Sequence, residues 1–585
     1  MSYRYFSLDL KRLVLSGVVL LILKPASSSA LTPDAGAILH QEQTLEKARS
    51  LPRDTARPVL LNVTPTSAVP DNEKIFVREF RIEGRLLRIK AEELQGLLAG
   101  YAGRDLTFSE LRMAAARITQ YYGDRGYFLA RAIVPKQEVQ DGVVVIVVNE
   151  GQLDSVEPVR INGNELRMRE HFARRFITIP LNESLHRPSL ERGLLNLNDN
   201  PGISATADLK PGTAPGTTKI VVDALEGPLL NGSLSMDNGG SRYVGSWRAI
   251  GTININDPFR YGDQLSMTGI AATGEVFRMG KVGYSLPISA SGLRANVAYT
   301  DLYYELGKEM ATDPVSFGKA RNLSVSLRYP IFRSAGTALF IGSGYDWKST
   351  INESSGLQTS NKRLDIYNVN LTWQRTDMFL GGGFTQLQVG DVEGTLDLSG
   401  CRSELLNDQG VGGAQTDGTY RKFIWQALRI QRGTERLSFR LSADGQFAQK
   451  NLDGSEKISL GGPAGVRAYP SGEASGDDGG KLSIDAKYLA FKGTEFGDIV
   501  PSFFIDYGWI RQYRDSSLIA QMSTPNTYSL SGLGIGVDVV KPGKYDFKFV
   551  WAKALGDNPG TSSSGNNSDG KAERFRFWMV GNISF

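Results

Sequence analysis

The sequence predicts a membrane all-β protein, in which a sixteen-stranded transmembrane β-barrel follows two small α+β domains. Three observations support this fold class. The N-terminus has the form of an export signal, residues 74–228 contain an internal repeat, and the rest of the chain alternates apolar and polar residues in one strand after another. A chain of 585 residues is also too long for one ordinary core, so several domains are expected.

Residues 1–30 have the order of a secretory signal peptide. Basic residues precede an apolar run at 13–23, and the small residues of "ASSSA" follow it. The run is about half as long as a membrane-spanning helix. The alternative to a signal peptide is an ordinary buried helix, which would have a similar composition. We therefore expect the mature chain to leave the cytoplasm.

Residues 31–73 are expected to form a short helix and a linker. The helix covers about residues 34–50, where Ile38, Leu39 and Leu45 are the main apolar positions. Four prolines between 52 and 70 then favour an extended linker.

Two stretches of the next region resemble each other. "FRIEG" at 80–84 recurs as "VRING" at 159–163, and "VVIVVNEG" ending at Gly151 recurs as "KIVVDALEG" ending at Gly227. The spacing indicates a repeated small domain, with one copy at 74–152 and the next at 153–228. Each copy is expected to have the order β-α-α-β-β. In the first copy we expect strands at 75–84, 129–134 and 142–149, and helices at 91–99 and 109–123.

From residue 229 to residue 585 the chain has a period of two. This period over strands of about ten residues is typical of a membrane barrel with an apolar outside and a polar inside, and an even strand number is expected. A soluble β-sandwich also alternates, but rarely over such a length. One example of the alternation is Leu323, Val325, Leu327 and Tyr329 interleaved with Ser324, Ser326 and Arg328.

Loop lengths give the expected orientation of the barrel. Short turns such as 257–260 and 432–435 follow even strands, whereas long connections follow odd strands. Short periplasmic turns and long outer loops are typical of such barrels, so both barrel ends and the repeat domains are expected in the periplasm. The long connections are expected at 306–317, 394–418, 450–480, 514–526 and 557–571.

The last strand, "FRFWMVGNISF", has an aromatic face that ends the chain. Phe575, Phe577 and Phe585 share that face. A buried strand of a soluble protein could end in the same way. After a predicted barrel, these residues look like the terminal signal by which the outer-membrane assembly machinery recognises its substrates.

This combination resembles the two-partner-secretion transporters, often called TpsB, which export haemolysins and filamentous haemagglutinin. The repeat is similar to tandem POTRA domains. The segment 450–480 resembles the long sixth extracellular loop of that family, with its Val-Arg-Gly-Tyr/Phe tetrad. Here the tetrad is Val466, Arg467, Ala468 and Tyr469, so alanine replaces the usual glycine. This replacement would be strained only if the backbone requires a positive φ there.

The resemblance implies that the sixth loop folds back into the barrel. An arginine buried there needs a partner, because an unpaired buried charge is costly. In "PSFFIDYGWI" the period of two directs Asp506 toward the lumen, and Phe504-Ile505-Asp506 matches the family's Phe-x-Asp motif. We therefore expect an Arg467–Asp506 pair. The alternative is a solvated loop arginine and one of many lumenal acids.

Other functions have weak support. The formal charge of +4 disfavours a nucleic-acid partner, and a single cysteine allows neither a disulfide nor a cysteine-based zinc site. The glycine-rich stretches lack the spacings of phosphate and dinucleotide loops. The three histidines lie outside the barrel region, so no Ser-His-Asp site is expected in a pore. We predict no enzyme activity, no cofactor and no metal.

The resemblance implies export of a secreted partner exoprotein, haemolysin- or adhesin-like, across the outer membrane without ATP. The POTRA-like domains would capture the unfolded partner, and addition of a strand to a sheet edge is one suitable mode. The sixth loop and the helix at 34–50 would close the resting pore. We expect a monomer in contact with outer-membrane lipid. An assembly factor that inserts other barrels, or a passive porin, remain the alternatives.

Overall fold

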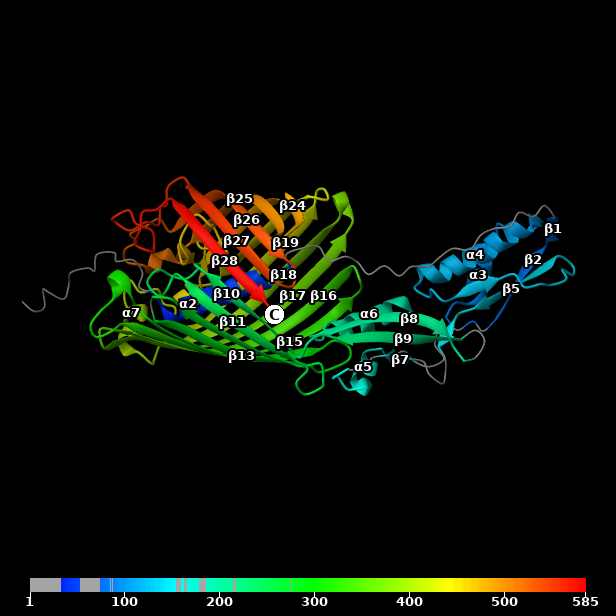
Figure 1. The fold of residues 1–585 in the computed structure, drawn as a ribbon, viewed down its shortest axis with the longest axis horizontal. Coiled ribbons are helices and arrows are strands. Elements are labelled where there is room, and N and C mark those ends of the chain that lie inside the picture. The colour runs from blue at the N-terminus through cyan, green and yellow to red at the C-terminus, as the bar shows by residue number, and fades with distance from the viewer. Residues whose placement is uncertain are drawn as a thin grey trace, which may run out of the picture.

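The computed structural model describes residues 33–52, 74–84, 86, 88–153, 159–162, 166–177, 186–213, 217–274 and 276–585. The expected signal peptide and most of the expected linker lie outside the described residues. Two small α+β units extend from one end of a large barrel, and helix α2 (Ala35–Ser50) lies within the barrel (Figure 1).

The first small unit is a helix-covered sheet. It contains β1 (Lys74–Val77), β2 (Glu79–Glu83), α3 (Ala91–Leu98), β3 (Arg104–Thr107), α4 (Phe108–Asp124), β4 (Arg131–Ile133) and β5 (Val143–Asn149). The central strand β5 is parallel to β2 and antiparallel to β4. The prediction of a single strand at 75–84 is wrong, because the segment divides into β1 and β2 at Arg78. The N–H of Arg78 donates to the carbonyl of Gly142. The first half of the segment instead pairs with β3, which was not predicted.

The second small unit repeats this arrangement. It contains β6 (Gln152–Leu153), β7 (Val159–Asn162), α5 (Glu170–Phe176), α6 (Arg187–Asn198), β8 (Ile203–Pro211) and β9 (Thr217–Glu226). The central strand β9 is parallel to β7 and antiparallel to β8. The glutamates that end the repeated sequences have matching roles. Glu150 accepts from the N–H of Arg88, and Glu226 accepts from the N–H groups of Arg167 and Met168.

The rest of the chain forms a closed antiparallel barrel, which confirms the predicted fold class. Strands β23 and β24 both pair with β25, and with these two counted as one interrupted strand the barrel has sixteen. The last strand closes on the first through Ser233–Asp237 and Val580–Ser584. The strands are β10 (Leu230–Asp237), β11 (Arg248–Asn256), β12 (Gln264–Ala272), β13 (Phe277–Pro287), β14 (Arg294–Glu305), β15 (Phe317–Arg333), β16 (Thr337–Ser354), β17 (Leu357–Asp377), β18 (Gly383–Asp397), β19 (Gly418–Arg432), β20 (Leu437–Ala448), β23 (Asp478–Tyr488), β24 (Phe491–Thr494), β25 (Gly497–Arg511), β26 (Thr527–Lys541), β27 (Tyr545–Leu555) and β28 (Phe575–Ser584).

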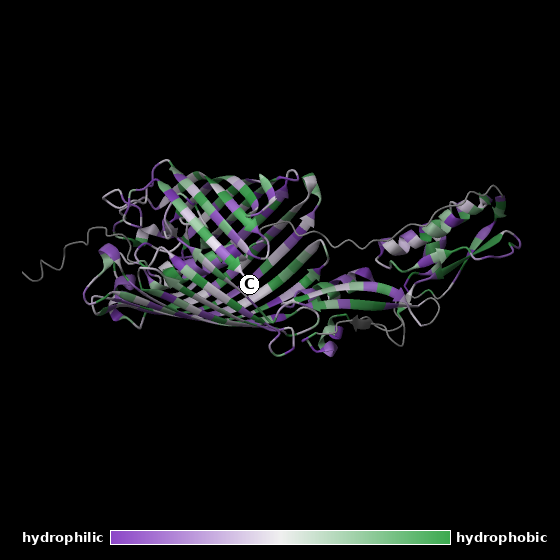
Figure 2. Ribbon diagram, viewed as in Figure 1, coloured by the Kyte–Doolittle hydropathy of each residue, from purple (hydrophilic) through white to green (hydrophobic). Residues whose placement is uncertain are grey.

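Alternate residues of each strand face opposite sides of the barrel wall. On β25, Phe503 and Ile505 are each 47 % exposed on the outside, whereas Phe504 and Asp506 are each 1 % exposed on the inside. The resulting alternation of hydropathy along the strands is visible in Figure 2. The wall thus has an apolar outer surface that suits lipid and an inner surface of mixed polarity.

Among the described residues, no helix is both long enough and apolar enough to cross a membrane.

The long loops lie at one end of the barrel and the tight turns at the other. The predicted loop at 394–418 is shorter than expected, because β18 continues to Asp397 and the loop itself contains α7 (Arg402–Gln409). The second small unit packs against the tight-turn end. Arg333 forms a 2.6 Å ion pair with Asp199 there, and Arg192 donates to the carbonyl of Pro330. The small units and the tight turns therefore share one side of the membrane.

Candidate functional site

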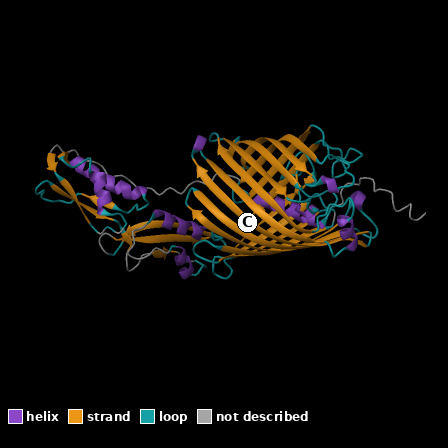
Figure 3. Ribbon diagram, turned by 180° about the vertical axis from the view of Figure 1, so that it is seen from behind, coloured by secondary structure: helices purple, strands orange, loops and turns teal. Residues whose placement is uncertain are grey.

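Two segments far apart in the sequence fill the barrel lumen. One is α2, and the other is the connection between β20 and β23, residues 449–477, which we call loop 6. Figures 1 and 3 show α2 surrounded by the strands of the barrel from both sides. Loop 6 contains a short 3-10 turn, η3 (Gly454–Glu456), and the small hairpin of β21 (Ile458–Ser459) and β22 (Ser475–Gly476). Together they form the candidate functional site.

Asp34 caps the N-terminus of helix α2, and its side chain accepts from the N–H groups of Gly36 and Ala37. Its apolar face is narrow: Ala35, Ile38 and Leu39 pack in a cluster against the inner wall. Most of its remaining contacts are charged, as expected for a helix with polar surroundings on several sides. The ion pairs from α2 and its cap to the wall are Arg49–Asp237 at 2.5 Å, Glu42–Arg248, Glu46–Lys281 at 2.6 Å and Asp34–Lys362 at 3.3 Å.

Arg248 is the most deeply buried of these wall partners. Its guanidinium donates to both Glu42 of α2 and Asp237 of β10. Arg49 of α2 also contacts Asp237. This network joins the middle and the C-terminal end of the helix to the first two barrel strands. It was not predicted from the sequence, because its members are distant along the chain.

The tetrad of loop 6 lies deep inside the barrel. Val466, Ala468 and Tyr469 are at most 2 % exposed, and the Arg467 side chain is almost completely buried. Their apolar groups join a cluster that includes wall residues of β25–β28. Burial of this much apolar surface stabilises the loop tip without requiring any charge.

Every nitrogen of the Arg467 guanidinium has a hydrogen-bond partner. Its Nη2 lies 2.7 Å from Asp506 Oδ1, its Nε lies 2.9 Å from Asp506 Oδ2, and its backbone N–H also donates to that carboxylate. Its remaining side-chain donors reach Asp485 and Ser483 of β23, each at 2.7 Å. The guanidinium carbon lies 3.5 Å from the ring centroid of Phe504. The structure thus brings together the predicted residues Arg467, Asp506 and Phe504.

Asp485, Ser483 and Trp578 also contact Arg467, and sequence reasoning missed all three. Trp578 donates its indole N–H to the Arg467 carbonyl at 2.7 Å. The period of two places Ser483 and Asp485 on the lumenal face of β23, so this pattern could have identified them as candidates. The pattern alone could not select them among the other lumenal side chains.

Glycines in the wall allow the close approach of the loop. A Cβ on Gly532 would lie 2.6 Å from the Cβ of Ala468, and a Cβ on Gly508 would lie 2.9 Å from the Leu460 side chain. The backbone of Ala468 does not adopt a positive φ, so alanine at this tetrad position is not strained. The small residue at 532 therefore accommodates the methyl group of Ala468.

The outer half of loop 6 binds the opposite wall. Glu456 accepts from Lys348 of β16 at 2.8 Å and from Lys422 of β19 at 2.9 Å. Asp453 forms a 2.7 Å ion pair with Lys362 of β17. Loop 6 is thus attached to both sides of the barrel.

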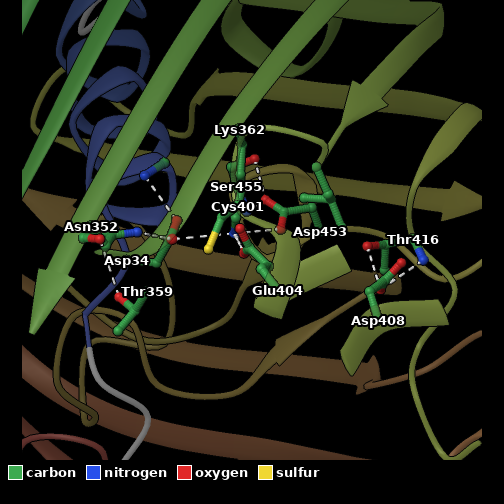
Figure 4. Close-up of polar contacts among 12 residues, drawn as sticks. Asp34, Asn352, Thr359, Lys362, Cys401, Glu404, Asp408, Thr416, Asp453 and Ser455 are labelled. Atoms are coloured by element: carbon green, nitrogen blue, oxygen red, sulfur yellow. Dashed lines mark hydrogen bonds and ion pairs between the residues drawn. The ribbon is translucent and has the colours of Figure 1, made fainter. Parts of the chain in front are cut away.

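Lys362 joins three different parts of the molecule. Its ammonium group contacts Asp34 at the start of α2, Asp453 of loop 6 and Glu404 of α7 (Figure 4). Asn352 of β16 also donates to Asp34 at 2.6 Å. The helix, loop 6 and an outer loop therefore share one buried cation near the end of the barrel that carries the long loops.

The long loops also contact one another around this end. Arg242, between β10 and β11, binds Glu309, between β14 and β15, at 2.6 Å. The hydrogen bond from this guanidinium lowers the pKa of Glu309 to about 2. Among the residues that the structure describes, no cluster of His, Cys, Asp and Glu side chains has the form of a metal site.

Family comparisons match both parts of the chain. Residues 216–539 match the family described as haemolysin secretion/activation protein ShlB/FhaC/HecB, and residues 75–151 match the ShlB-type POTRA domain. The heme/hemopexin transporter protein HuxB of Haemophilus influenzae strain 86-028NP is 25 % identical over 500 residues, 84 % of each chain. The outer membrane transporter CdiB of Escherichia coli O6:K15:H31 is 25 % identical over 551 residues, 89 % of this chain and 90 % of CdiB.

Solved structures resemble the whole fold. CdiB from Escherichia coli has a TM-score of 0.74 at 20 % identity, covering 96 % of this chain and all of the solved chain. CdiB from Acinetobacter baumannii has a TM-score of 0.66 at 15 % identity, covering 95 % of this chain and all of its own. Both likenesses support the arrangement of small units and barrel.

Proposed function

The chain belongs to the haemolysin secretion/activation family of ShlB, FhaC and HecB, and from this premise we propose how it exports its partner. It is an outer-membrane transporter of the two-partner-secretion type, with its POTRA domains in the periplasm. We propose that the cargo is a haemolysin- or adhesin-like exoprotein that crosses the barrel lumen unfolded. Its folding outside the cell would supply the free energy, so that no nucleotide is needed.

The observation that carries this proposal is the way in which the lumen is filled. Helix α2 is attached to the wall mainly by ion pairs. Glu42–Arg248 is buried, whereas Arg49–Asp237 and Glu46–Lys281 are partly exposed. Exposed ion pairs contribute little net stability, so most of the cost of releasing the helix lies in the buried Glu42–Arg248 pair, and Arg248 keeps Asp237 as a partner. Departure of the helix would open a route along a polar wall, which suits the backbone of an extended polypeptide.

Edge strands of the two POTRA-like units differ in a way that favours the second unit for cargo capture. In the first unit, Thr119 accepts from the N–H of the edge-strand residue Ala132 on β4. Past the end of β4, the Gln137 side-chain amide bonds both the N–H and the carbonyl of Val145 on the central strand β5. Side chains of the first unit therefore already occupy backbone hydrogen-bonding groups along its β4 edge.

In the second unit, Asn198 similarly bonds both backbone groups of Ala205 on β8. The strand then continues to Pro211, and the alternation of an antiparallel strand directs the backbone groups of Ala207 and Leu209 away from β9. We propose that an extended segment of the exoprotein pairs here, by addition of a strand to the sheet edge.

Secretion into the medium tests both levels of the proposal. The chain is co-expressed with an exoprotein encoded beside its gene, and export should require the chain. Ala207→Pro removes one outward N–H from the β8 edge and should reduce secretion, whereas Thr206→Ala should not. Secretion that needs the chain but tolerates Ala207→Pro would refute the edge and leave the export function intact.

Two other functions have less support. An assembly factor for other barrels shares the general architecture, but the family match is to secretion proteins. A passive porin would require neither the POTRA-like units nor an ion-paired helix in its lumen.

We also propose that Phe575, Phe577 and Phe585 serve as the signal for barrel assembly. All three lie on the outer face of β28 or at its end and are exposed. Replacing Phe585 with serine should lower the amount of folded barrel in the membrane, measured by heat-modifiable gel mobility. Unchanged folding would contradict the proposed signal.

A further inference from the structure

A basic and aromatic surface lies where the second POTRA-like unit meets the barrel. The segment "RMREHFARR" at 167–175 contains α5, and Arg169, His171, Arg174 and Arg175 are all exposed. The segment carries one carboxylate, Glu170, which is paired with Arg174 at 2.7 Å. A further exposed cation, Arg260, lies on the adjoining turn between β11 and β12, and its side chain donates to the Arg167 carbonyl. The surface thus carries a clear excess of positive charge.

Aromatic rings fix this surface to the barrel rim. Phe172 of α5 packs edge-to-face on Tyr261, with ring centroids 4.8 Å apart. The Arg169 guanidinium lies 4.9 Å from the Tyr261 ring centroid, and its Nη1 donates to the Tyr261 hydroxyl. We call Arg169, Phe172, Arg175, Arg260 and Tyr261 the rim patch. Arg175 also approaches the ring of Phe172, at 5.9 Å.

The same turn reaches the lipid-facing surface of the barrel. Phe259, two residues before Tyr261, is 61 % exposed and packs edge-to-face against Tyr284. Tyr284 lies on β13 two residues after Val282, so it shares the outer face on which Val282 is 50 % exposed. The aromatic residues therefore continue from the outer wall onto the turn, and the cations begin where the wall ends. In Figure 1, α5 lies beside the end of the barrel that carries the small units.

We propose that the rim patch binds the phosphate groups of anionic phospholipids in the periplasmic leaflet of the outer membrane. In membrane proteins, aromatic residues lie at the edge of the apolar belt, at the level of the lipid headgroups. Arginines follow them on the aqueous side, where their charged groups reach the headgroups. Arginine is suited to phosphate because its planar group donates two parallel hydrogen bonds. The contact would seat the second POTRA-like unit against the membrane beside the entrance of the barrel.

An acidic segment of the exported protein could also meet a basic surface. Lipid is favoured here because the patch is continuous with the lipid-facing wall at Phe259 and Tyr284. A periplasmic polypeptide would have no need of aromatic residues at the level of the wall.

Site-specific quenching tests the proposal on the full mature chain. The native Cys401 is buried, so His171→Cys provides one exposed attachment point for a fluorophore on α5. The labelled chain is placed in nanodiscs of phosphatidylcholine and phosphatidylglycerol in equal amounts. A trace of either lipid carrying a nitroxide near its headgroup is then included. The phosphatidylglycerol quencher should quench about twice as strongly as the phosphatidylcholine quencher, since each arginine near an anionic surface contributes attraction.

Matched variants decide what causes the preference. Arg169→Gln with Arg175→Gln should equalise the two quenchers, whereas Arg169→Lys with Arg175→Lys should retain most of the difference. High salt should also reduce it, because screening weakens exposed electrostatic contacts. Heat-modifiable gel mobility checks that every variant has a folded barrel.

Equal quenching by the two lipids in the original chain would overturn the proposal. So would quenching by neither lipid combined with protection of the fluorophore by an added exoprotein segment, because this would assign the surface to the cargo.

Discussion

Loop 6 and α2 both occupy the lumen, yet they are attached to the wall by different interactions. The tip of loop 6 buries Val466, Ala468 and Tyr469 in an apolar cluster and adds an arginine whose three guanidinium nitrogens are all hydrogen-bonded. Helix α2 buries a narrow apolar face and otherwise relies on ion pairs, of which Glu42–Arg248 is buried. The Arg49 side chain is 35 % exposed and that of Glu46 is 53 % exposed, so water reaches part of this contact.

This difference indicates which segment can move. A buried, hydrogen-bonded charge inside an apolar cluster is hard to disrupt, because each lost partner leaves a desolvated group behind. Partly hydrated ion pairs can be exchanged for water with little penalty. We infer that loop 6 acts as part of the wall while α2 acts as a removable plug.

Deletion of residues 31–50 should have the largest effect on the closed state. The lumen of a sixteen-stranded barrel is wide enough for an aqueous channel, so the conductance in planar bilayers should rise strongly. Loop 6 should remain attached, because Arg467 and its apolar neighbours do not depend on α2. Unchanged conductance in a correctly folded barrel would exclude a plugging role for the helix.

The next largest effect, on the stability of loop 6, should follow the removal of one partner from the Arg467–Asp506 pair. Arg467→Ala or Asp506→Ala should each destabilise the loop by about 3–5 kcal/mol, because a buried charge is left without its partner. Both should abolish secretion. The double variant should cost less than the sum of the two, which a double-mutant cycle on unfolding free energies measures.

The exposed barrel pair Arg421–Asp391 provides the control for that cycle. Its side chains are 53 % and 45 % exposed, and the same substitutions there should cost at most about 1 kcal/mol. Additive effects at Arg467 and Asp506 would show that the two residues act independently.

An intermediate effect is expected where Ala468 meets Gly532. Gly532→Ala places a methyl group against that of Ala468 and should destabilise the loop by about 1–3 kcal/mol through overpacking. Ala468→Gly, which removes the opposing methyl group, should rescue Gly532→Ala. The control is Gly269→Ala on β12, where an added Cβ would meet nothing within 4 Å. Lack of rescue would mean that the wall, rather than the loop, causes the strain.

The smallest effect should come from one ion pair of α2. Glu46→Gln removes the contact with Lys281, which should be worth about 0.2–1 kcal/mol, and should increase brief channel openings. High salt should have the same effect on the original chain through screening. Lys47→Gln is the control, because Lys47 has no ion-pair partner among the described residues. Openings that respond to Lys47→Gln but not to Glu46→Gln would contradict this attachment of the helix.

Much of the fold could be predicted because its pattern is local. Leu323 lies on the outer face of β15 and Ser324 on the inner face, because lipid lies outside the wall and water inside. The same alternation of apolar and polar residues is required in every strand. The repeat predicted the order of the small units for the same reason. Short or divided strands were the exceptions: β3 pairs with β1 across the first unit, and no local pattern in "RDLT" indicates that partner.

The amino-acid sequence by itself determined the barrel, its strand number, the two small units and a lumenal face for Asp506, because alternation and turn residues act over a few neighbouring positions. Tertiary structure decided how the lumen is filled. Glu42 meets Arg248, and Lys362 collects Asp34, Asp453 and Glu404, only because closure of the barrel brings together residues from distant parts of the chain. The partners of these charged residues are set by the closed shape of the barrel. No periodicity along the chain predicts such pairs, because their members are far apart in the sequence.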